Sequence, residues 1–357
     1  MQHHKIIRKI NLPELLRTKS AFLLGPRQTG KTWTITHQLP DAKFINLLLN
    51  ETYLRFQQNK RELRERVTLQ DKLVIIDEIQ RLPELLNEVQ YLIEKQGTLF
   101  LLTGSSARKL RRDGVNLLGG RARQYFMHPF SKQELGDQFD LLRALTFGLI
   151  PSIYFSDNPA LDLSSYVGLY LKEEIAAEAL TRKIDAYSRF LQTAALANGQ
   201  LVNHTNIAND AQVPRTTVIE YFEILIDTLL ATYVKPWKMT AKRKSLSTSK
   251  FYFFDNGVIS QLQERGTLRQ KSPQFGEAFE TYIYHELKTY TDTTTPRPIN
   301  YWRSRSGFEV DFIYDNTVAI EVKGKDTIGK RELSGLRALM EEDLLQRYLV
   351  VCLEQDK

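Results

Sequence analysis

A glycine-rich octapeptide is the first stretch of this 357-residue chain whose residue types could do chemistry. It follows the apolar run 21–24, has the pattern G-x-x-x-x-G-K-T, and consists of Gly25, Pro26, Arg27, Gln28, Thr29, Gly30, Lys31 and Thr32. Between a strand and a helix, such a loop turns its backbone N–H groups around a phosphate, and the helix dipole adds positive potential. We expect Lys31 to reach the β- and γ-phosphates and the Thr32 hydroxyl to join a magnesium shell. The pattern predicts a site for ATP and Mg²⁺; the alternative is an ordinary glycine-rich turn.

Two adjacent acids, Asp77 and Glu78, directly follow the apolar run 73–76. A carboxylate at the end of a buried strand beside a phosphate loop can hold the water shell of magnesium, and the next one can orient and polarise the attacking water. We therefore assign Asp77 to the metal and Glu78 to catalysis. Without the upstream loop, two solvated acids at a strand end would be the better interpretation.

Two further side chains could complete a nucleotide site. Ser105, in Thr103-Gly104-Ser105-Ser106, follows another apolar run and could sense the γ-phosphate, although helix capping by Ser105 or Ser106 would explain the same residues. Arg121 comes after two glycines in a basic stretch. An arginine that a neighbouring subunit supplies in trans lowers the hydrolysis barrier only in an assembly. A solvated basic face is the alternative for Arg121.

The elements that must position these residues form an α/β pattern. Apolar runs at 21–24, 44–49, 73–76, 98–102 and 123–127 are separated by helical or polar stretches. This alternation predicts a parallel sheet with crossover helices. Ser131 and Glu134 have the spacing of a capping box, which indicates a helix after the fifth strand. Residues 136–182 then predict a small helical lid.

These motifs resemble those of a family of prokaryotic AAA-type P-loop ATPases in which the ATPase module precedes a poorly characterised C-terminal region. The resemblance covers nearly the whole chain and is carried by the segments 25–32, 75–80, 103–106, 120–121 and 129–131. It implies nucleotide hydrolysis and a homo-oligomer, such as a hexameric ring.

The middle segment, 183–256, predicts a winged helix that binds DNA. Pro214 precedes Arg215, Thr216 and Thr217, which suit the N-terminal end of a recognition helix in a major groove. A basic stretch between two strands, 231–234 and 251–254, suits a mobile wing that contacts phosphates. Its cations include Lys238, Lys242, Arg243 and Lys244. Winged helices also dock proteins, and a basic loop is often only solvated, so these alternatives stay open.

The C-terminal segment predicts a helix at 275–290, strands at 299–303, 308–314 and 318–323, a helix at 331–340 and a last strand at 348–353. Pairing Tyr314 with Val318 places apolar side chains on one hairpin face and brings Asp311 opposite Glu321. Asn316 or Thr317 would then accommodate the chain reversal. Opposed carboxylates repel unless they share a divalent cation.

Asp311 and Glu321 therefore suggest a metal site, with Lys323 placed to position or activate a water and Glu280 placed to complete the shell. In this order, the four residues resemble those of restriction-endonuclease-like nucleases, which carry a helix Glu, a strand Asp and a Glu-x-Lys. A plain ion pair between Glu309 and Lys323 is the alternative. Retained cleavage and a repurposed domain are both open.

Composition limits the class of protein. The length suggests two or three domains, and the net charge of +7 favours an anionic partner where basic residues cluster. The single cysteine forms no internal disulfide. No apolar run reaches the length of a membrane span, so we expect no membrane partner and a cytoplasmic location.

Together these features predict an AAA-type core at 1–135, a lid at 136–182, a winged helix at 183–256 and a small α/β nuclease-like domain at 270–357. The function expected is that of an oligomeric, ATP-hydrolysing, DNA-binding protein that remodels DNA or translocates on it, for example on branched DNA in repair or recombination. An ATP-gated nuclease in DNA processing or defence and a nucleotide-controlled DNA-binding switch are the alternatives.

Overall fold

The computed structural model describes residues 6–106, 118–171 and 184–353. The chain divides into two compact units, here called unit 1 and unit 2. Unit 1 comprises Met1–Phe130 with Asp227–Leu229, and unit 2 comprises Ser131–Ile226 with Leu230–Lys357. None of the helices in the described ranges combines the length and apolar character needed to traverse a bilayer.

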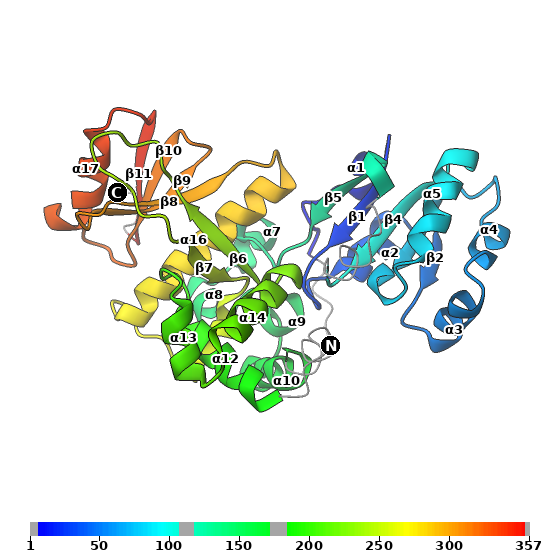
Figure 1. The fold of residues 1–357 in the computed structure, drawn as a ribbon, viewed down its shortest axis with the longest axis horizontal. Coiled ribbons are helices and arrows are strands. Elements are labelled where there is room, and N and C mark those ends of the chain that lie inside the picture. Colours follow the sequence, from blue (N-terminus) through cyan, green and yellow to red (C-terminus); the bar gives the residue numbers. More distant parts are fainter. Residues whose placement is uncertain (1–5, 107–117, 172–183, 354–357) are drawn as a thin grey trace. The chain divides into compact units, whose positions relative to one another are not determined.

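Unit 1 contains a five-stranded sheet in which every neighbouring pair of strands is parallel (Figure 1). Its strand order is β2-β3-β4-β1-β5. The strands are β1 (Ser20–Leu24), β2 (Lys43–Asn46), β3 (Leu73–Asp77), β4 (Leu99–Gly104) and β5 (Ala122–Phe126). The helices are α1 (Leu12–Leu15), α2 (Lys31–Gln38), α3 (Asn50–Gln58), α4 (Glu62–Arg66), α5 (Leu85–Gln96) and the 3-10 turns η1 (Ile79–Arg81) and η2 (Leu118–Gly120). The predicted parallel sheet is confirmed.

Burial on both faces explains why the three inner strands of unit 1, β1, β3 and β4, are nearly continuous apolar runs. Phe22 and Leu24 of β1 join one hydrophobic cluster, while Ala21 and Leu23 join another. Successive side chains of a strand point to opposite faces, and helices cover both faces of a parallel sheet. The carboxyl ends of all five strands therefore meet at one edge, and β4 lies between β1 and β3 there.

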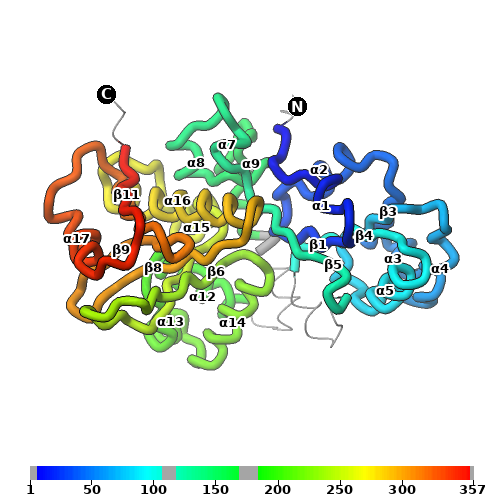
Figure 2. The backbone as a smooth tube through the Cα atoms, turned by 90° about the horizontal axis from the view of Figure 1, so that it is seen from above, coloured from blue at the N-terminus to red at the C-terminus, as the bar shows by residue number. Residues whose placement is uncertain are grey.

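Unit 2 combines a helical layer with a second sheet. Its helices are α7 (Lys132–Leu135), η3 (Gly136–Gln138), α8 (Leu141–Phe147), α9 (Pro151–Tyr154), α10 (Pro159–Ser165), η4 (Tyr166–Leu171), α12 (Ile184–Leu196), α13 (His204–Ala211), α14 (Arg215–Asp227), α15 (Asn256–Leu262), α16 (Pro273–Thr293), η5 (Lys330–Leu333) and α17 (Ser334–Met340). Its strands are β6 (Ala231–Pro236), β7 (Lys250–Phe253), β8 (Ile299–Arg303), β9 (Glu309–Tyr314), β10 (Val318–Val322) and β11 (Arg347–Val351). α16 runs alongside α8 and α15 (Figure 2).

Local sequence signals explain several boundaries in unit 2. The predicted capping box at α7 is present: the Ser131 side chain accepts from the Glu134 N–H and the Glu134 carboxylate accepts from the Ser131 N–H. α15 was not predicted, although Asp255 caps its N-terminus. α16 begins two residues before the prediction, at Pro273, because Ser272 caps it.

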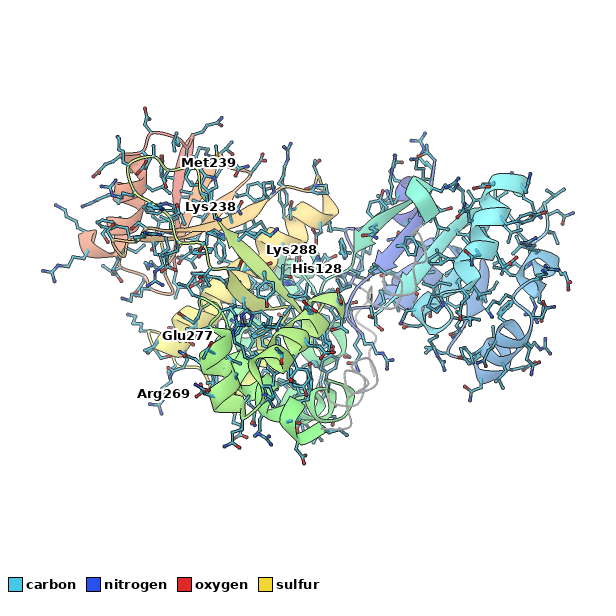
Figure 3. The ribbon with its side chains drawn as sticks, in the orientation of Figure 1. His128, Lys238, Met239, Arg269, Glu277 and Lys288 are labelled. Atoms are coloured by element: carbon cyan, nitrogen blue, oxygen red, sulfur yellow. The ribbon has the colours of Figure 1, made fainter. Side chains whose placement is uncertain are left out.

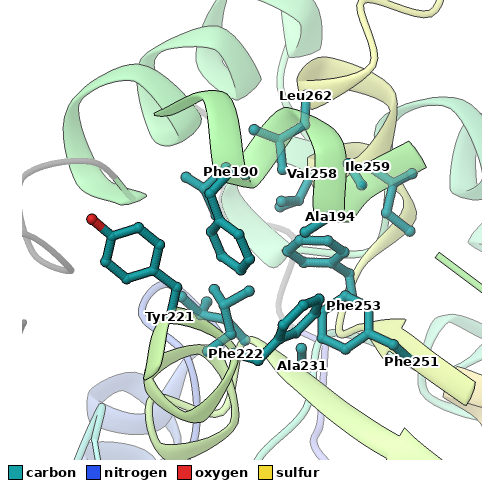
Figure 4. Close-up of a cluster of buried hydrophobic side chains, with 14 of the residues drawn as sticks. Phe190, Ala194, Tyr221, Phe222, Ala231, Phe251, Phe253, Val258, Ile259 and Leu262 are labelled. Carbon is teal, nitrogen blue, oxygen red and sulfur yellow. The ribbon is translucent and has the colours of Figure 1, made fainter. Parts of the chain in front are cut away.

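A core of aromatic rings holds the helical layer against the first hairpin of unit 2 (Figure 4). Phe222 of α14 packs edge-to-face on Phe190 of α12 at 5.1 Å and on Phe251 of β7 at 4.8 Å between ring centroids. Phe251 packs in turn on Phe253 at 5.1 Å. Edge-to-face pairs add about 0.5–1.5 kcal/mol each to the free energy of burial. The hairpin β6/β7 is therefore fixed to α12 and α14.

The six strands of unit 2 form one sheet in the order β11-β10-β9-β8-β6-β7. β6 pairs in parallel with β8, with Lys235 opposite Asn300 and Pro236 opposite Tyr301. Strands from the predicted winged helix and from the predicted nuclease-like domain thus share a sheet. Sequence reasoning did not predict the pairing of β6 with β8. The predicted boundary at 182/183 lies outside the described residues, and the division of unit 2 into three domains stays a prediction.

The β9/β10 hairpin has the predicted register, with Tyr314 opposite Val318 and Phe312 opposite Ile320. Asp315 and Asn316 take left-handed conformations, with φ of 52° and 56°, and the Thr317 N–H donates to the Tyr314 carbonyl at 3.1 Å. The reversal therefore uses Asn316, as expected, and Asp315 rather than Thr317, because a primed turn needs two consecutive residues with positive φ.

Candidate functional site

The glycine-rich loop lies at the carboxyl edge of the unit 1 sheet, between β1 and α2. Gln28 and Gly30 have φ of 60° and 89°, which curl the backbone ahead of the helix. A Cβ at Gly25 would lie 2.2 Å from the Met127 carbonyl oxygen, so that position requires glycine. The Gly25 N–H donates to the Gly104 carbonyl at 3.2 Å and joins the loop to the end of β4.

Lys31, the first residue of α2, is buried, and its ammonium donates to the carbonyl oxygens of Gly25 at 2.7 Å and Pro26 at 2.9 Å. Burial lowers the pKa of Lys31 to about 8, against the opposing influence of the Glu78 and Asp77 charges. The hydrogen-bond partners of this cation are neutral, so its charge is uncompensated by direct contact. Such a cation favours an anion that can replace the carbonyls.

Asp77 ends β3 next to the loop. Its two carboxylate oxygens accept from the hydroxyls of Thr32, at 3.4 Å, and Thr103. Burial raises the pKa of Asp77, and the Thr103 hydrogen bond opposes that rise. The Thr32 hydroxyl and the Asp77 carboxylate are hard oxygen ligands of the kind that magnesium takes. These residues fit the predicted magnesium role.

Glu78 follows in a left-handed conformation, with φ of 60°. Its Oε2 accepts from Ser105 Oγ at 3.3 Å and from the Gln80 side-chain amide, which also donates to Ser105 Oγ at 3.1 Å. The Glu78 N–H donates to Thr103 Oγ1 at 3.1 Å. The structure thus brings the predicted Glu78 and Ser105 together. Gln80 and Thr103 were assigned no role from the sequence, although both lie inside the motifs that carried the resemblance.

The remaining residues of the loop are either buried and hydrogen-bonded or exposed. Pro26 is buried and its carbonyl accepts from Thr29 Oγ1 at 2.8 Å, whereas Arg27 and Gln28 are exposed. The buried Arg8 donates to the Thr29 carbonyl and, at 2.7 Å, to the His128 carbonyl. Sequence reasoning missed Arg8, because nothing in an N-terminal run of isoleucines indicates a contact with a loop twenty residues later.

Arg121 lies at the amino ends of the unit 1 strands, whereas the loop lies at their carboxyl ends. It precedes Ala122, which pairs with Ser20 at the start of β1, whereas the loop follows the end of β1. One strand of this length separates the two edges by roughly 16 Å. The Arg121 guanidinium contacts Glu94 at 2.7 Å and donates to the Leu118 carbonyl at 3.3 Å. Arg121 therefore does not belong to the loop of its own chain.

A second group of charged residues lies in unit 2 and is here called the acidic cluster; it consists of Glu280, Glu309, Asp311 and Glu321. The structure places the predicted residues Asp311 of β9, Glu321 of β10 and Glu280 of α16 in mutual electrostatic contact. Lys323 Nζ donates to Glu321 Oε1 at 2.6 Å, and Asp311 Oδ2 accepts from the Val322 N–H at 2.8 Å. Burial raises the pKa of Asp311, and the charges of Glu280 and Glu321 raise it further. Burial also raises the pKa of Glu321.

Sequence reasoning placed Lys250 of β7 among the cations of the basic loop, but the structure places it in the acidic cluster. Its side chain is 4 % exposed, and Nζ lies 2.7 Å from Glu309 Oε1 and 3.3 Å from Glu280 Oε1. Burial alone would lower the pKa of Lys250, but the charges of Glu280, Glu309 and Asp311 outweigh burial and raise it. Tyr252 also donates to Glu280. Over the described ranges, no three acidic, histidine or cysteine side chains are arranged to hold a metal ion.

The predicted DNA-binding residues of the helix-turn-helix occupy the first turn of α14. Arg215 and Thr216 are exposed and Thr217 is half-buried. A short turn with Gln212 at φ 54° separates α13 from α14. Leu201 forms an isolated antiparallel bridge to Lys250 of β7. The helices α12, α13 and α14 precede the hairpin β6/β7, and the winged helix stays a prediction.

The basic loop between β6 and β7, which was predicted as a wing, is anchored rather than free. Glu342, beyond α17, accepts from the backbone N–H groups of Ala241, Lys242 and Arg243 at 3.0 Å each. Arg243 also pairs with Glu341 and donates to the Ala338 carbonyl at 3.0 Å. The expectation of a mobile loop is therefore corrected, because a buried carboxylate holds its backbone. The remaining predicted cations, Lys238, Lys242 and Lys244, are exposed, and Figure 3 labels Lys238 beside Met239.

Comparisons with known families divide the chain at nearly the same place as the structure. The family described as AAA domain matches residues 17–136. Residues 17–136 are an AAA-type ATPase domain. Two families described as domains of unknown function, DUF8612 and DUF4143, match residues 138–269 and 275–357.

The similar proteins have no assigned activity in their descriptions. The chain is 25 % identical over 308 residues to the uncharacterized protein Rv2008c of Mycobacterium tuberculosis, covering 83 % of this chain and 68 % of that one. It is 25 % identical over 231 residues to an uncharacterized protein of Haemophilus influenzae, covering 60 % and 56 %.

Among solved structures, the Walker-type ATPase PABY2304 of Pyrococcus abyssi aligns at 17 % identity with a TM-score of 0.48, over 71 % of this chain and 93 % of that one. The replication initiator DnaA bound to AMPPCP and single-stranded DNA aligns at 13 % identity with a TM-score of 0.31, over 62 % and 90 %. Both scores are below 0.5, so neither structure informs the function of this chain.

Proposed function

We propose that this protein is an oligomeric, ATP-hydrolysing, DNA-binding protein that remodels DNA or moves along it. The observation that carries the proposal is the buried Lys31 ammonium, whose partners are neutral carbonyls, at the sheet edge where Asp77, Glu78 and Ser105 also converge. A pre-organised cation with carboxylates on one side suits the β- and γ-phosphates of ATP.

In this proposal, Lys31 exchanges the carbonyls of Gly25 and Pro26 for phosphate oxygens. Thr32 and Asp77 would hold magnesium, and the ion would supply positive charge beside the phosphates. Glu78 orients and polarises the attacking water. Gln80 and Ser105 hold one Glu78 oxygen, so the carboxylate is oriented before the substrate arrives and its second oxygen is left for the water.

Glu78→Gln tests the hydrolytic part of the proposal, because an amide cannot polarise water as a carboxylate does. We expect loss of ATP turnover with retained ATP binding, measured by phosphate release and by equilibrium dialysis. Unchanged turnover would refute the assignment. Glu84→Gln is the matched control, since Glu84 is exposed in the same unit.

We propose that Arg121 acts in trans in a ring such as a hexamer, supported by its place at the sheet edge away from its own loop. Arg121→Ala and Glu78→Gln subunits should each be inactive alone, while a mixture regains turnover at sites that combine an intact Glu78 with an intact Arg121. No recovery on mixing would contradict the trans role. Arg123→Ala, an exposed neighbour on β5, is the control.

DNA binding is supported by the exposed Arg215 and Thr216 on α14 and by the exposed lysines Lys238, Lys242 and Lys244. Arg215→Ala should weaken binding to duplex DNA and reduce its salt dependence, measured by fluorescence anisotropy. Arg269→Ala, an exposed arginine labelled in Figure 3, is the control. Equal affinities for both variants would argue against this surface.

DNA stimulation separates the two ATP-dependent functions. A motor should hydrolyse ATP much faster with DNA, whereas a nucleotide-controlled switch should change its DNA affinity with nucleotide and need no such rise.

We also propose a restriction-endonuclease-like fold for residues 270–357, supported by the order α16, β8, β9, β10, α17 and β11 and by the places of Glu280, Asp311, Glu321 and Lys323. A cytoplasmic location is proposed from the single cysteine.

A further inference from the structure

The acidic cluster draws on three segments far apart in the sequence. Glu280 comes from α16, Glu309 and Asp311 come from β9, and Glu321 comes from β10. Lys250 reaches this cluster from β7, the hairpin strand that packs on α14 through Phe251. Because β6 adds to the edge of β8, the hairpin carries Lys250 to the carboxylates.

Each carboxylate of the acidic cluster already has a donor from the protein. Glu280 accepts from Lys250 and Tyr252, and Glu309 accepts from Lys250 and contacts Arg303 at 3.2 Å. Asp311 accepts from the Val322 N–H. Glu321 accepts from Lys323, and its Oε2 is the one buried carboxylate oxygen without a hydrogen-bond partner in the part of the chain that the structure describes.

A divalent cation needs several oxygen ligands from one side, and carboxylates supply them only when their lone pairs face the ion. Here a buried ammonium lies against Glu280 and Glu309 within the same cluster. Displacing it would leave an uncompensated buried charge, which is far more costly than displacing water. The arrangement therefore does not fit the metal site that the Glu, Asp and Glu-x-Lys pattern implied.

We propose that Lys250 is the resident cation of the acidic cluster, that it stands in place of a divalent metal, and that unit 2 does not cleave DNA. The cluster instead ties the β6/β7 hairpin to α16 and β9. In this way the helix-turn-helix and the second sheet form one rigid unit, which can hold DNA without cutting it.

Manganese binding to the full-length, nucleotide-free protein tests the proposal, with Mn²⁺ followed by electron paramagnetic resonance. The wild-type protein and Glu321→Gln should bind Mn²⁺ alike, with no site lost in the variant. A tight wild-type site that disappears in Glu321→Gln would overturn the proposal. This comparison does not require any change at Lys250, so it decides even if Lys250 variants fail to fold.

Lys250→Met then tests the role of the ammonium. Without the Lys250 ammonium, several carboxylates are free to bind Mn²⁺ from solution, so the affinity for Mn²⁺ should rise by at least roughly tenfold. The double variant Lys250→Met/Glu321→Gln should not show this rise in affinity. Lys325→Met is the matched control, because Lys325 pairs with Glu332 on the exposed surface after β10. A folded Lys250→Met protein with unchanged affinity would contradict the claim that this ammonium fills the site.

Cleavage gives an independent readout. Plasmid and branched DNA incubated with Mg²⁺ or Mn²⁺ should remain intact with the wild-type protein and with Asp311→Ala/Glu321→Ala alike. Cutting by the wild-type protein that the double variant loses would overturn the proposal. Neither result changes with Glu78→Gln, so failure here is distinct from failure of the proposed ATPase activity.

Discussion

Two lysines are buried beside carboxylates, Lys31 in unit 1 and Lys250 in unit 2. Their pKa values are shifted in opposite directions. Lys31 donates to two backbone carbonyls, and burial lowers its pKa to about 8. Lys250 donates to two carboxylates, whose charges outweigh burial and raise its pKa. The first cation is poised for an anion that arrives, and the second is already neutralised by its own chain.

This difference teaches that residue types do not identify a functional site on their own. Both sites combine a buried lysine with acids, and the residues predicted for each site resembled motifs of enzymes. What separates them is the group to which each ammonium is bonded. A buried charge that is hydrogen-bonded to neutral dipoles can still bind a charged ligand. A buried charge in an ion pair is already neutralised by its partner.

The largest effect is expected from breaking the ion pairs of unit 2. Lys250→Met leaves Glu280 and Glu309 without their shared cation, so the free energy of unfolding should fall by about 3–5 kcal/mol. Urea titration followed by tryptophan fluorescence measures this change. Lys325→Met, at an exposed pair, should change stability by less than about 0.5 kcal/mol. Equal effects of the two substitutions would erase the contrast between a buried and a surface pair.

The next effect concerns catalysis in unit 1. Glu78→Gln should lower kcat for ATP hydrolysis by roughly 10²–10³-fold, because a single positioned group of this kind contributes about that much. KM and ATP affinity should change little, since Lys31 keeps its contacts. Glu84→Gln should retain full activity. Turnover within a factor of about two of the wild type would remove Glu78 from the mechanism.

A smaller effect is expected when the support for Glu78 is removed. Gln80→Ala deletes the amide that bridges Glu78 and Ser105, and should lower kcat roughly tenfold, the value of one hydrogen bond to a charged group. KM should stay nearly constant, because Gln80 positions the base rather than the phosphates. Gln90→Ala, a surface amide on α5, is the control. A rise in KM without a fall in kcat would contradict a positioning role.

The smallest effect is a pH dependence that follows from Lys31. In the free protein the pKa of Lys31 is about 8, and bound phosphate favours the charged form, so ATP binding takes up a proton above that pH. Affinity is therefore full below pH 8 and should fall about tenfold between pH 7 and pH 9. Isothermal titration in buffers of different ionisation enthalpy measures the proton uptake. Lys31→Arg should flatten the profile, because arginine stays charged throughout.

The chain's local patterns were enough to predict much of the structure. The apolar runs and the glycine spacing located the five strands of unit 1 and the loop after β1, because backbone sterics and burial on both faces act over a few residues. The alternation in 309–323 predicted the register of Tyr314 with Val318. It did so because a slip of one residue would have put charges into the apolar layer.

Contacts between distant segments escaped prediction. The contacts of Gln80 with Ser105, of Arg8 with the Thr29 carbonyl and of Glu342 with the basic loop each join residues whose own neighbours in sequence give no signal. They depend on which element packs on which, and strand pairing such as that of β6 with β8 joins segments far apart in the sequence.

The sequence by itself determined that unit 1 would carry a phosphate loop with two acids at the same sheet edge, since parallel strands must end together. Only the tertiary structure decided which cation lies against the acidic cluster. The pairing of β6 with β8 brings Lys250 against Glu280 and Glu309. Burial makes an unpaired charge costly, and at this place the Lys250 ammonium lies against the carboxylates that a metal would otherwise have used.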